Sequence, residues 1–124
     1  MADGHRSSED YLEAILMIRQ AKGSCRSVDV AAHLGFSKPS VSVAVGKLVD
    51  SGCLQRMEDG QLVLTEKGMA IASNTLDKHH LLTDLFCALG VSPETAEHDA
   101  CLIEHHLSEE TYEKLRRFWQ SRQN

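Results

Sequence analysis

Three side chains that can bind a metal ion stand close together near the end of the chain. Cys101, Glu104 and His105 are spaced at i, i+3 and i+4, so on a helix they share one face about one turn long. Thiolate, carboxylate and imidazole are all ligands of first-row transition metals, and one helix supplies only part of a coordination sphere. The spacing leaves two interpretations open: half of a metal site, or a solvated helix surface with Cys101 as a small core residue.

A second pair of metal-binding side chains lies on the first predicted helix, residues 7–21. Ser7 or Ser8 suits the helix cap, and the apolar residues that follow have helical spacing. Asp10 and Glu13 stand one turn apart and offer hard oxygen donors on one side. The alternative is that these acidic residues stabilise the start of the helix through its dipole.

Residues 27–50 are predicted to form a helix-turn-helix. A short helix from Ser27 ends at Gly35, and Pro39 suits the first position of a second helix that runs to Asp50. In this motif the second helix enters the major groove of DNA. An ordinary helical hairpin that does not bind DNA is the alternative.

Helical spacing divides the second of these helices into two faces. We expect the buried face to consist of Val41, Val45 and Leu48. We expect contacts with phosphates and base edges from the exposed side, namely Ser37, Lys38, Pro39, Ser40, Ser42, Val43 and Lys47. Because neither arginine nor glutamine lies on this side, phosphate contacts and DNA shape should supply much of the discrimination.

Residues 52–65 are predicted to form two short strands. Asp59-Gly60 is a strong signal for the turn that joins them. Two helices, a recognition helix and a hairpin follow one another in the order of a winged helix. Arg56, near the tip of this wing, would lie beside the phosphate backbone.

The C-terminal half is predicted to contain three more helices. Thr65 caps a long helix to about residue 89 that carries His79 and His80, each of which taken alone is more often a surface histidine than a ligand. Helices are then expected from Pro93 to a break near residue 107 and over residues 109–122. The last has an apolar stripe that requires either a second copy of the chain or an intramolecular core.

Length and composition limit the possible classes of protein. The 124 residues suffice for one core or two small units that share a helix. Thirteen basic against 18 acidic residues give a formal net charge of −5, so DNA binding requires positive charge gathered on one face. Four cysteines without a CxxC pair indicate reduced thiols, mostly in the core. With neither a signal peptide nor a membrane span in the sequence, we expect a cytoplasmic protein with no membrane partner.

Three segments together resemble one known family. EDYLE at residues 9–13, KHHLL at 78–82 and HDACLIEHHLS at 98–108, combined with a winged helix, are similar to the diphtheria toxin repressor and manganese transport regulator family. This resemblance implies a mainly α protein, with a winged helix-turn-helix domain at 1–70 and a helical dimerisation and metal-binding domain at 71–124. It also implies a homodimer that binds double-stranded operator DNA when loaded with Mn(II) or Fe(II), one or two ions per subunit, and represses metal-uptake genes.

The resemblance also implies a set of metal ligands. They are Asp10, Glu13, His79, Cys101, Glu104 and His105. Asp10 matches the manganese branch, whereas the iron branch has methionine there; Cys101 matches the iron branch, whereas the manganese branch has glutamate. The carboxylates suit Mn(II), and a thiolate favours Fe(II), Co(II) or Zn(II).

Two other functions are compatible with parts of the sequence. A zinc- or thiol-responsive winged-helix regulator would keep the fold, but a thiol sensor would not need Asp10. A metalloenzyme could use the same ligands to activate water, although the sequence has no evident nucleophile–base pair and the winged helix would be unexplained.

Overall fold

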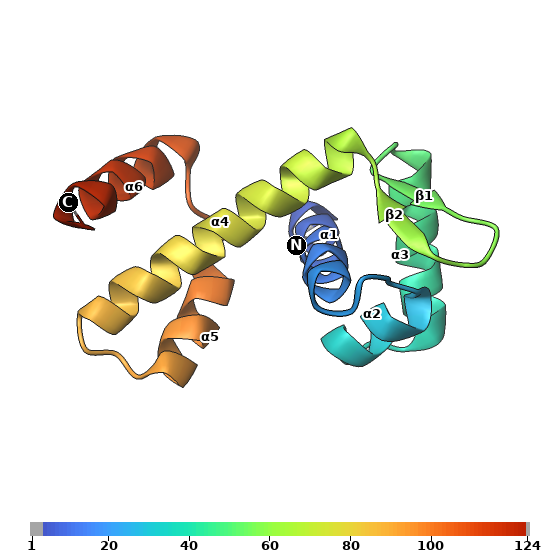
Figure 1. The fold of residues 1–124 in the computed structure, drawn as a ribbon, viewed down its shortest axis with the longest axis horizontal. Helices are drawn as coiled ribbons and strands as arrows, with labels where there is room; N and C mark the ends of the chain where they lie inside the picture. Colours follow the sequence, from blue (N-terminus) through green and yellow to red (C-terminus); the bar gives the residue numbers. More distant parts are fainter. Residues whose placement is uncertain (1–3, 124) are drawn as a thin grey trace. The chain divides into compact units, whose positions relative to one another are not determined.

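The computed structural model describes residues 4–123 (Figure 1). These residues form six helices and one antiparallel pair of strands, which confirms the predicted mainly α class. The elements are α1 (Gly4–Lys22), α2 (Ser27–Leu34), α3 (Lys38–Asp50), β1 (Leu54–Arg56), β2 (Leu62–Leu64), α4 (Glu66–Ala88), α5 (Pro93–Ile103) and α6 (Glu109–Gln123). The chain divides into two compact units between Ser73 and Asn74.

Helix α1 carries much of the core of the first unit. Its buried residues, as the apolar spacing predicts, include Tyr11, Leu12, Ile15, Leu16 and Ile18. The helix begins at Gly4, so the predicted cap at Ser7 or Ser8 is wrong: Ser8 lies inside the helix, and the side chain of Ser7 is outside the described part of the structure. The residues between Gly4 and Ser8 include no proline, and nothing in them prevents an earlier start.

Helices α2 and α3 form the predicted helix-turn-helix. Gly35 ends α2 in a left-handed conformation, with φ of 73°. The hydroxyl of Ser37 accepts a hydrogen bond from the Ser40 amide at 3.2 Å and caps α3. Because Lys38 is the first helical residue, Pro39 occupies the second position and not the predicted first. The predicted inward face is confirmed, since Val41, Val45 and Leu48 are all buried.

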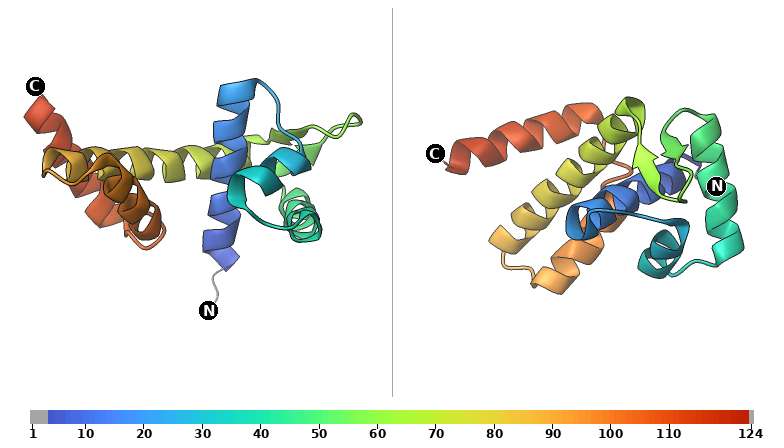
Figure 2. Two further views of the ribbon diagram at one scale, coloured as in Figure 1. Left: turned by 90° about the horizontal axis from the view of Figure 1, so that it is seen from below. Right: turned by 45° about the vertical axis from the view of Figure 1, so that its right-hand side comes forward.

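Strands β1 and β2 form the predicted hairpin. Leu54 pairs with Leu64, and Arg56 pairs with Leu62. The Gly60 amide donates to the Met57 carbonyl at 2.9 Å, so the turn predicted at Asp59-Gly60 is confirmed. The turn projects beyond the helices of the first unit, while the buried leucines attach the strands to them (Figure 2).

The start of α4 is fixed to the end of the hairpin region. The Thr65 hydroxyl accepts from the Gly68 amide at 3.1 Å and donates to the Gly52 carbonyl at 2.6 Å. Gly68 lies so close to Cys53, the residue before β1, that a Cβ there would be 2.0 Å from the Cys53 carbonyl oxygen. Only glycine fits at this position without displacing the backbone.

The second unit consists of the remainder of α4 with α5 and α6 beside it (Figure 1). Ser108 caps α6, as predicted, by accepting from the Thr111 amide at 3.1 Å. The buried Lys78 on α4 donates to the Glu109 carboxylate at 2.7 Å, and its ammonium lies 5.5 Å from the centre of the Tyr112 ring. These contacts fasten the first turns of α6 to α4.

Two of the four cysteines lie in the core and two are exposed. Cys25 and Cys53 are buried, and burial raises the pKa of the Cys25 thiol to about 11. Cys87 and Cys101 are exposed, so the expectation of mostly buried thiols holds for two of the four. Within residues 4–123, no helix has both the length and the apolar character of a membrane span.

Candidate metal centre and nucleic-acid interface

The carboxylate of Glu104 lies between two imidazoles in the second unit. Its Oε1 is 2.7 Å from Nδ1 of His79, which comes from α4. Its Oε2 is 3.5 Å from Nε2 of His105, the next residue along the chain. Glu104 is buried, with 1% of its surface exposed. Three of the six predicted ligands are therefore brought together by the second unit itself.

Glu104 and His105 lie just beyond helix α5, which ends at Ile103. The prediction that the helix extends over Glu104 and His105 is therefore wrong by one to two residues. Glu104 keeps helical backbone angles and its amide donates to the Ala100 carbonyl at 2.9 Å. The His106 amide then bonds to Ile103, three residues back, which tightens the chain into a turn.

The other three predicted ligands lie on helices α1 and α5. Cys101 is exposed on α5, whereas Glu104 is buried. Asp10 and Glu13 belong to the first unit, one turn apart on α1, where Asp10 is partly exposed and Glu13 is buried. Within the second unit, the imidazoles of His79 and His105 thus meet the carboxylate of Glu104.

The environment of Glu104 fits a divalent cation. A buried carboxylate costs free energy unless both oxygens are paired. Oε2 makes no hydrogen bond within the described residues, and its 3.5 Å distance to His105 is too long for a good one. A buried, incompletely satisfied carboxylate beside imidazoles is a donor set that suits manganese, iron or zinc.

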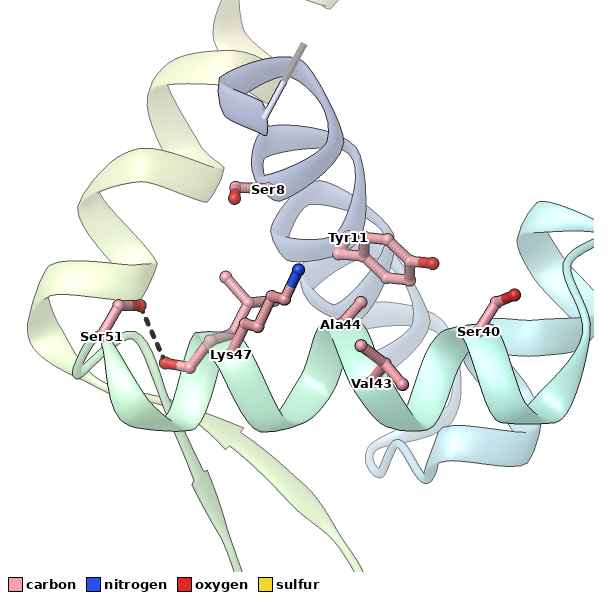
Figure 3. A pocket seen from close by; sticks show the side chains of 8 residues that line it. Ser8, Tyr11, Ser40, Val43, Ala44, Lys47 and Ser51 are labelled. Carbon is pink, nitrogen blue, oxygen red and sulfur yellow. Dashed lines mark hydrogen bonds between the residues drawn. The ribbon is translucent and has the colours of Figure 1, made fainter. Parts of the chain in front are cut away.

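The predicted recognition helix presents its polar face to solvent. All seven residues expected to contact DNA from it are exposed: Ser37, Lys38, Pro39, Ser40, Ser42, Val43 and Lys47. A hollow of about 660 Å³ lies on one side of α3 and is lined by Ser40, Val43 and Lys47 together with Ser8 and Tyr11 of α1. Figure 3 shows these side chains. Sequence patterns did not point to these two α1 residues as part of this surface.

A second hollow, of about 480 Å³, lies on the wing side of α3. Three cationic residues line it: Lys38 of α3, Arg56 of β1 and Arg26, which precedes α2. Positive charge is thus gathered locally in an acidic chain, as DNA binding requires. Arg26 was missed by sequence analysis because its neighbours in the wing are more than 30 residues away in the chain.

Both halves of the chain match descriptions of one family. Residues 5–67 match "Iron dependent repressor, N-terminal DNA binding domain", and residues 65–124 match "Iron dependent repressor, metal binding and dimerisation domain". The chain belongs to the iron-dependent repressor family. The resemblance to the diphtheria toxin repressor and manganese transport regulator, drawn from three sequence segments, is confirmed.

Relatives within the iron-dependent repressor family include regulators from two distant bacteria. The transcriptional regulator MntR of Escherichia coli O6:H1 (strain CFT073) is 36% identical over 120 residues, which cover 95% of this chain and 77% of the relative. The HTH-type transcriptional regulator MntR of Listeria monocytogenes serotype 4a (strain HCC23) is 35% identical over 109 residues, or 88% of this chain and 77% of the relative.

Solved structures of the iron-dependent repressor family have the same fold. The manganese regulator SloR is 27% identical with a TM-score of 0.78, and the match covers 91% of this chain and 53% of that one. The chain therefore spans about half the length of this structural relative. The predicted winged helix followed by a helical metal-binding and dimerisation domain is confirmed by these matches.

Proposed function

We propose that this chain is a metal-dependent repressor of transcription that binds operator DNA as a homodimer. The observation that carries the proposal is the buried Glu104 carboxylate between His79 and His105, in a chain whose other unit is a winged helix. The relatives' names support the regulatory role and manganese as the ion. The genes controlled are those for metal uptake.

Within this proposal His79, Glu104 and His105 hold a divalent ion, Mn(II) or Fe(II), at one or two positions per subunit. The ring nitrogens Nδ1 of His79 and Nε2 of His105 already lie within 3.5 Å of the Glu104 carboxylate. Asp10, Glu13 and Cys101 complete the ligand set on the strength of their spacing in the sequence and the family resemblance. The bound ion supplies positive charge and a link between ligands from different elements.

The proposed ligands come from both proposed domains, 1–70 as the DNA-reading domain and 71–124 as the dimerisation domain. Metal binding by residues of both domains would supply the coupling that a metal-dependent regulator requires. Neutralising acidic ligands also favours the approach of DNA to a chain with a formal charge of −5.

DNA is contacted from the exposed face of α3 and from Arg56 on the wing. The lysines and Arg56 neutralise backbone phosphates, the serine hydroxyls bond to phosphates and base edges, and Val43 offers an apolar contact to a thymine methyl. Two such surfaces in a homodimer would read two half-sites about one helical turn apart.

To test the proposal, apo protein is titrated calorimetrically with Mn(II), with Zn(II) and, under anaerobic conditions, with Fe(II). Operator binding is then measured at fixed salt with each ion. We expect Mn(II) or Fe(II) to raise DNA affinity by at least about tenfold, which corresponds to about 1.4 kcal/mol of coupling. Equal DNA affinity with and without metal would contradict the proposal.

A zinc-responsive regulator is the second candidate, because Cys101 presents an exposed thiol one turn before Glu104. Thiolate selects zinc more strongly than manganese. If zinc is the ion, Cys101→Ser should reduce Zn(II)-dependent DNA binding, and Cys87→Ser, which removes another exposed thiol, should leave it unchanged. A purely thiol-responsive regulator should keep its response in Asp10→Asn.

A further inference from the structure

The wing is attached to the segment between α1 and α2 along the free edge of β2. The Leu62 amide donates to the Cys25 carbonyl at 2.7 Å, and Arg26 and Gln61 form an isolated antiparallel bridge. A guanidinium nitrogen of Arg19, on α1, donates to the Leu62 carbonyl at 3.1 Å. The base of the wing is thus held by backbone and side-chain bonds.

The tip of the wing is held by Arg26. Its guanidinium donates to the carbonyl of Asp59, inside the turn. Gly60, with φ of 89°, lies against the same guanidinium, since a Cβ there would be 2.9 Å from the Arg26 nitrogen. Hydrogen bonds from Gln61 and the charge of Arg26 lower the pKa of the Asp59 carboxyl, so it stays ionised beside this contact.

Arg26 is also anchored at its own backbone. Its amide donates to the Asp29 carboxylate at 2.9 Å, and the ammonium of Lys22 bonds to the same carboxylate at 2.8 Å. The start of α2 therefore fixes the Arg26 backbone, while its side chain reaches the wing. Arg26, Lys38 and Arg56 line the wing-side hollow, which has the size and charge to receive a phosphate group.

We propose that Arg26 is a positioning residue for DNA binding. By holding the wing tip beside the start of α2, it keeps the hollow at a width at which Lys38 and Arg56 face one phosphate of the DNA backbone. This role rests on the proposed DNA-binding function, and it is distinct from a direct contribution of the Arg26 charge.

The test compares Arg26→Gln with Arg56→Gln, a matched loss of one charge from the same hollow. Backbone ¹⁵N heteronuclear relaxation is measured on the tip residues Asp59, Gly60 and Gln61 in the absence of DNA. Arg26→Gln should make the tip clearly more mobile, whereas Arg56→Gln should leave it as in the wild type.

Operator binding between 50 and 200 mM salt supplies the second measurement. Loss of a phosphate contact should reduce the salt slope by about one in either variant. Arg26→Gln should also lose about tenfold in operator affinity at every salt concentration. This loss is independent of salt because a mobile wing must become ordered on binding, and the cost is conformational entropy and not electrostatic. An Arg26→Gln tip as rigid as the wild type would overturn the proposal, as would affinities that match those of Arg56→Gln at every salt concentration.

The two proposals fail separately. If the wild-type protein binds no operator with any metal, the repressor function is wrong, and the relaxation data still decide whether Arg26 holds the wing. If the wild type binds DNA but the tip does not depend on Arg26, the repressor function stands and the positioning role is wrong.

Discussion

Glu104 is the residue on which the proposed metal site most depends. Its buried carboxylate lies within 3.5 Å of both neighbouring imidazoles, so it can bind an ion together with either of them. Glutamine has nearly the same shape but carries no negative charge, and an amide is a much weaker ligand than a carboxylate.

Glu104→Gln should therefore weaken Mn(II) binding by at least about tenfold. Glu97→Gln, which removes an exposed carboxylate from helix α5 just before Glu104, serves as the control and should bind Mn(II) like the wild type. Calorimetric titration of the three proteins under identical conditions gives the comparison. Unchanged affinity in Glu104→Gln would remove this residue from the ligand set.

Sequence spacing and the family resemblance predicted the side chains of this candidate site but not their contacts. The pair Glu104–His105 is adjacent in the chain, and its donor character was readable from residue type. The contact of Glu104 with His79 joins residues 25 positions apart, and only the packing of α4 against the end of α5 creates it. Arg26 illustrates the same limit, since no local pattern marks a side chain that bonds to a turn 33 residues away.

At the scale of elements, the boundaries that carry a chemical signal were predicted best. Gly35, Ser37 and Ser108 each end or begin a helix through a specific backbone conformation or hydrogen bond. At the start of α1 the serine signal at residues 7 and 8 misleads, because the helix begins earlier, and the end of α5 has no such signal. Both boundaries depend on which backbone groups find partners in the folded chain, and there prediction missed by a few residues.

Two glycines in helices should respond oppositely to alanine. Gly68→Ala places a methyl group against the Cys53 carbonyl and should destabilise the protein by about 2 kcal/mol or more. Gly46, inside α3, has nothing within 4 Å of the position that an added methyl group would take, so Gly46→Ala should stabilise by up to about 1 kcal/mol. Urea unfolding measures both, and a shift of the same sign in the two variants would contradict this account.

The attachment of α6 to α4 should depend on pH. The hydrogen bond from Lys78 holds the pKa of Glu109 below its usual value of 4.5, so the ion pair stabilises the fold above that pH and loses its effect as pH falls through the lowered pKa. Because Glu109 is largely exposed, the contribution is modest, about 0.5 kcal/mol.

Glu109→Gln should accordingly lower the free energy of unfolding at pH 7 and have a smaller effect at pH 3, where more of the Glu109 carboxyl is protonated. Glu110→Gln removes an equal charge from the neighbouring exposed residue and controls for net charge. Urea unfolding at both pH values provides the measurement. If Glu109→Gln lowered the free energy of unfolding as much at pH 3 as at pH 7, the contact would act through packing and not through charge.

For the whole molecule, the second unit leaves large apolar side chains exposed. They are Leu89, Leu102, Ile103 and Phe118. A second copy of the chain can cover such residues, in agreement with the family's description of this half as a dimerisation domain.

Phe118→Glu should raise the dimer dissociation constant by at least about tenfold, because it places a charge on an apolar surface that the proposed dimer would bury. Ser121→Glu adds the same charge to the same helix at a position that is already polar and exposed, and should leave the dimer intact. Sedimentation velocity over a range of concentrations distinguishes the two. Equal dissociation constants for both variants would exclude Phe118 from the interface.

The attachment of the wing also sets the order in which the first unit can fold. Helices α1, α2 and α3 follow one another closely, so their mutual contacts close short loops. The bonds from Arg19 to Leu62 and from Arg26 to Asp59 close loops of 43 and 33 residues, which carry a larger entropic cost. We therefore expect the three helices to associate first and the hairpin to close onto them.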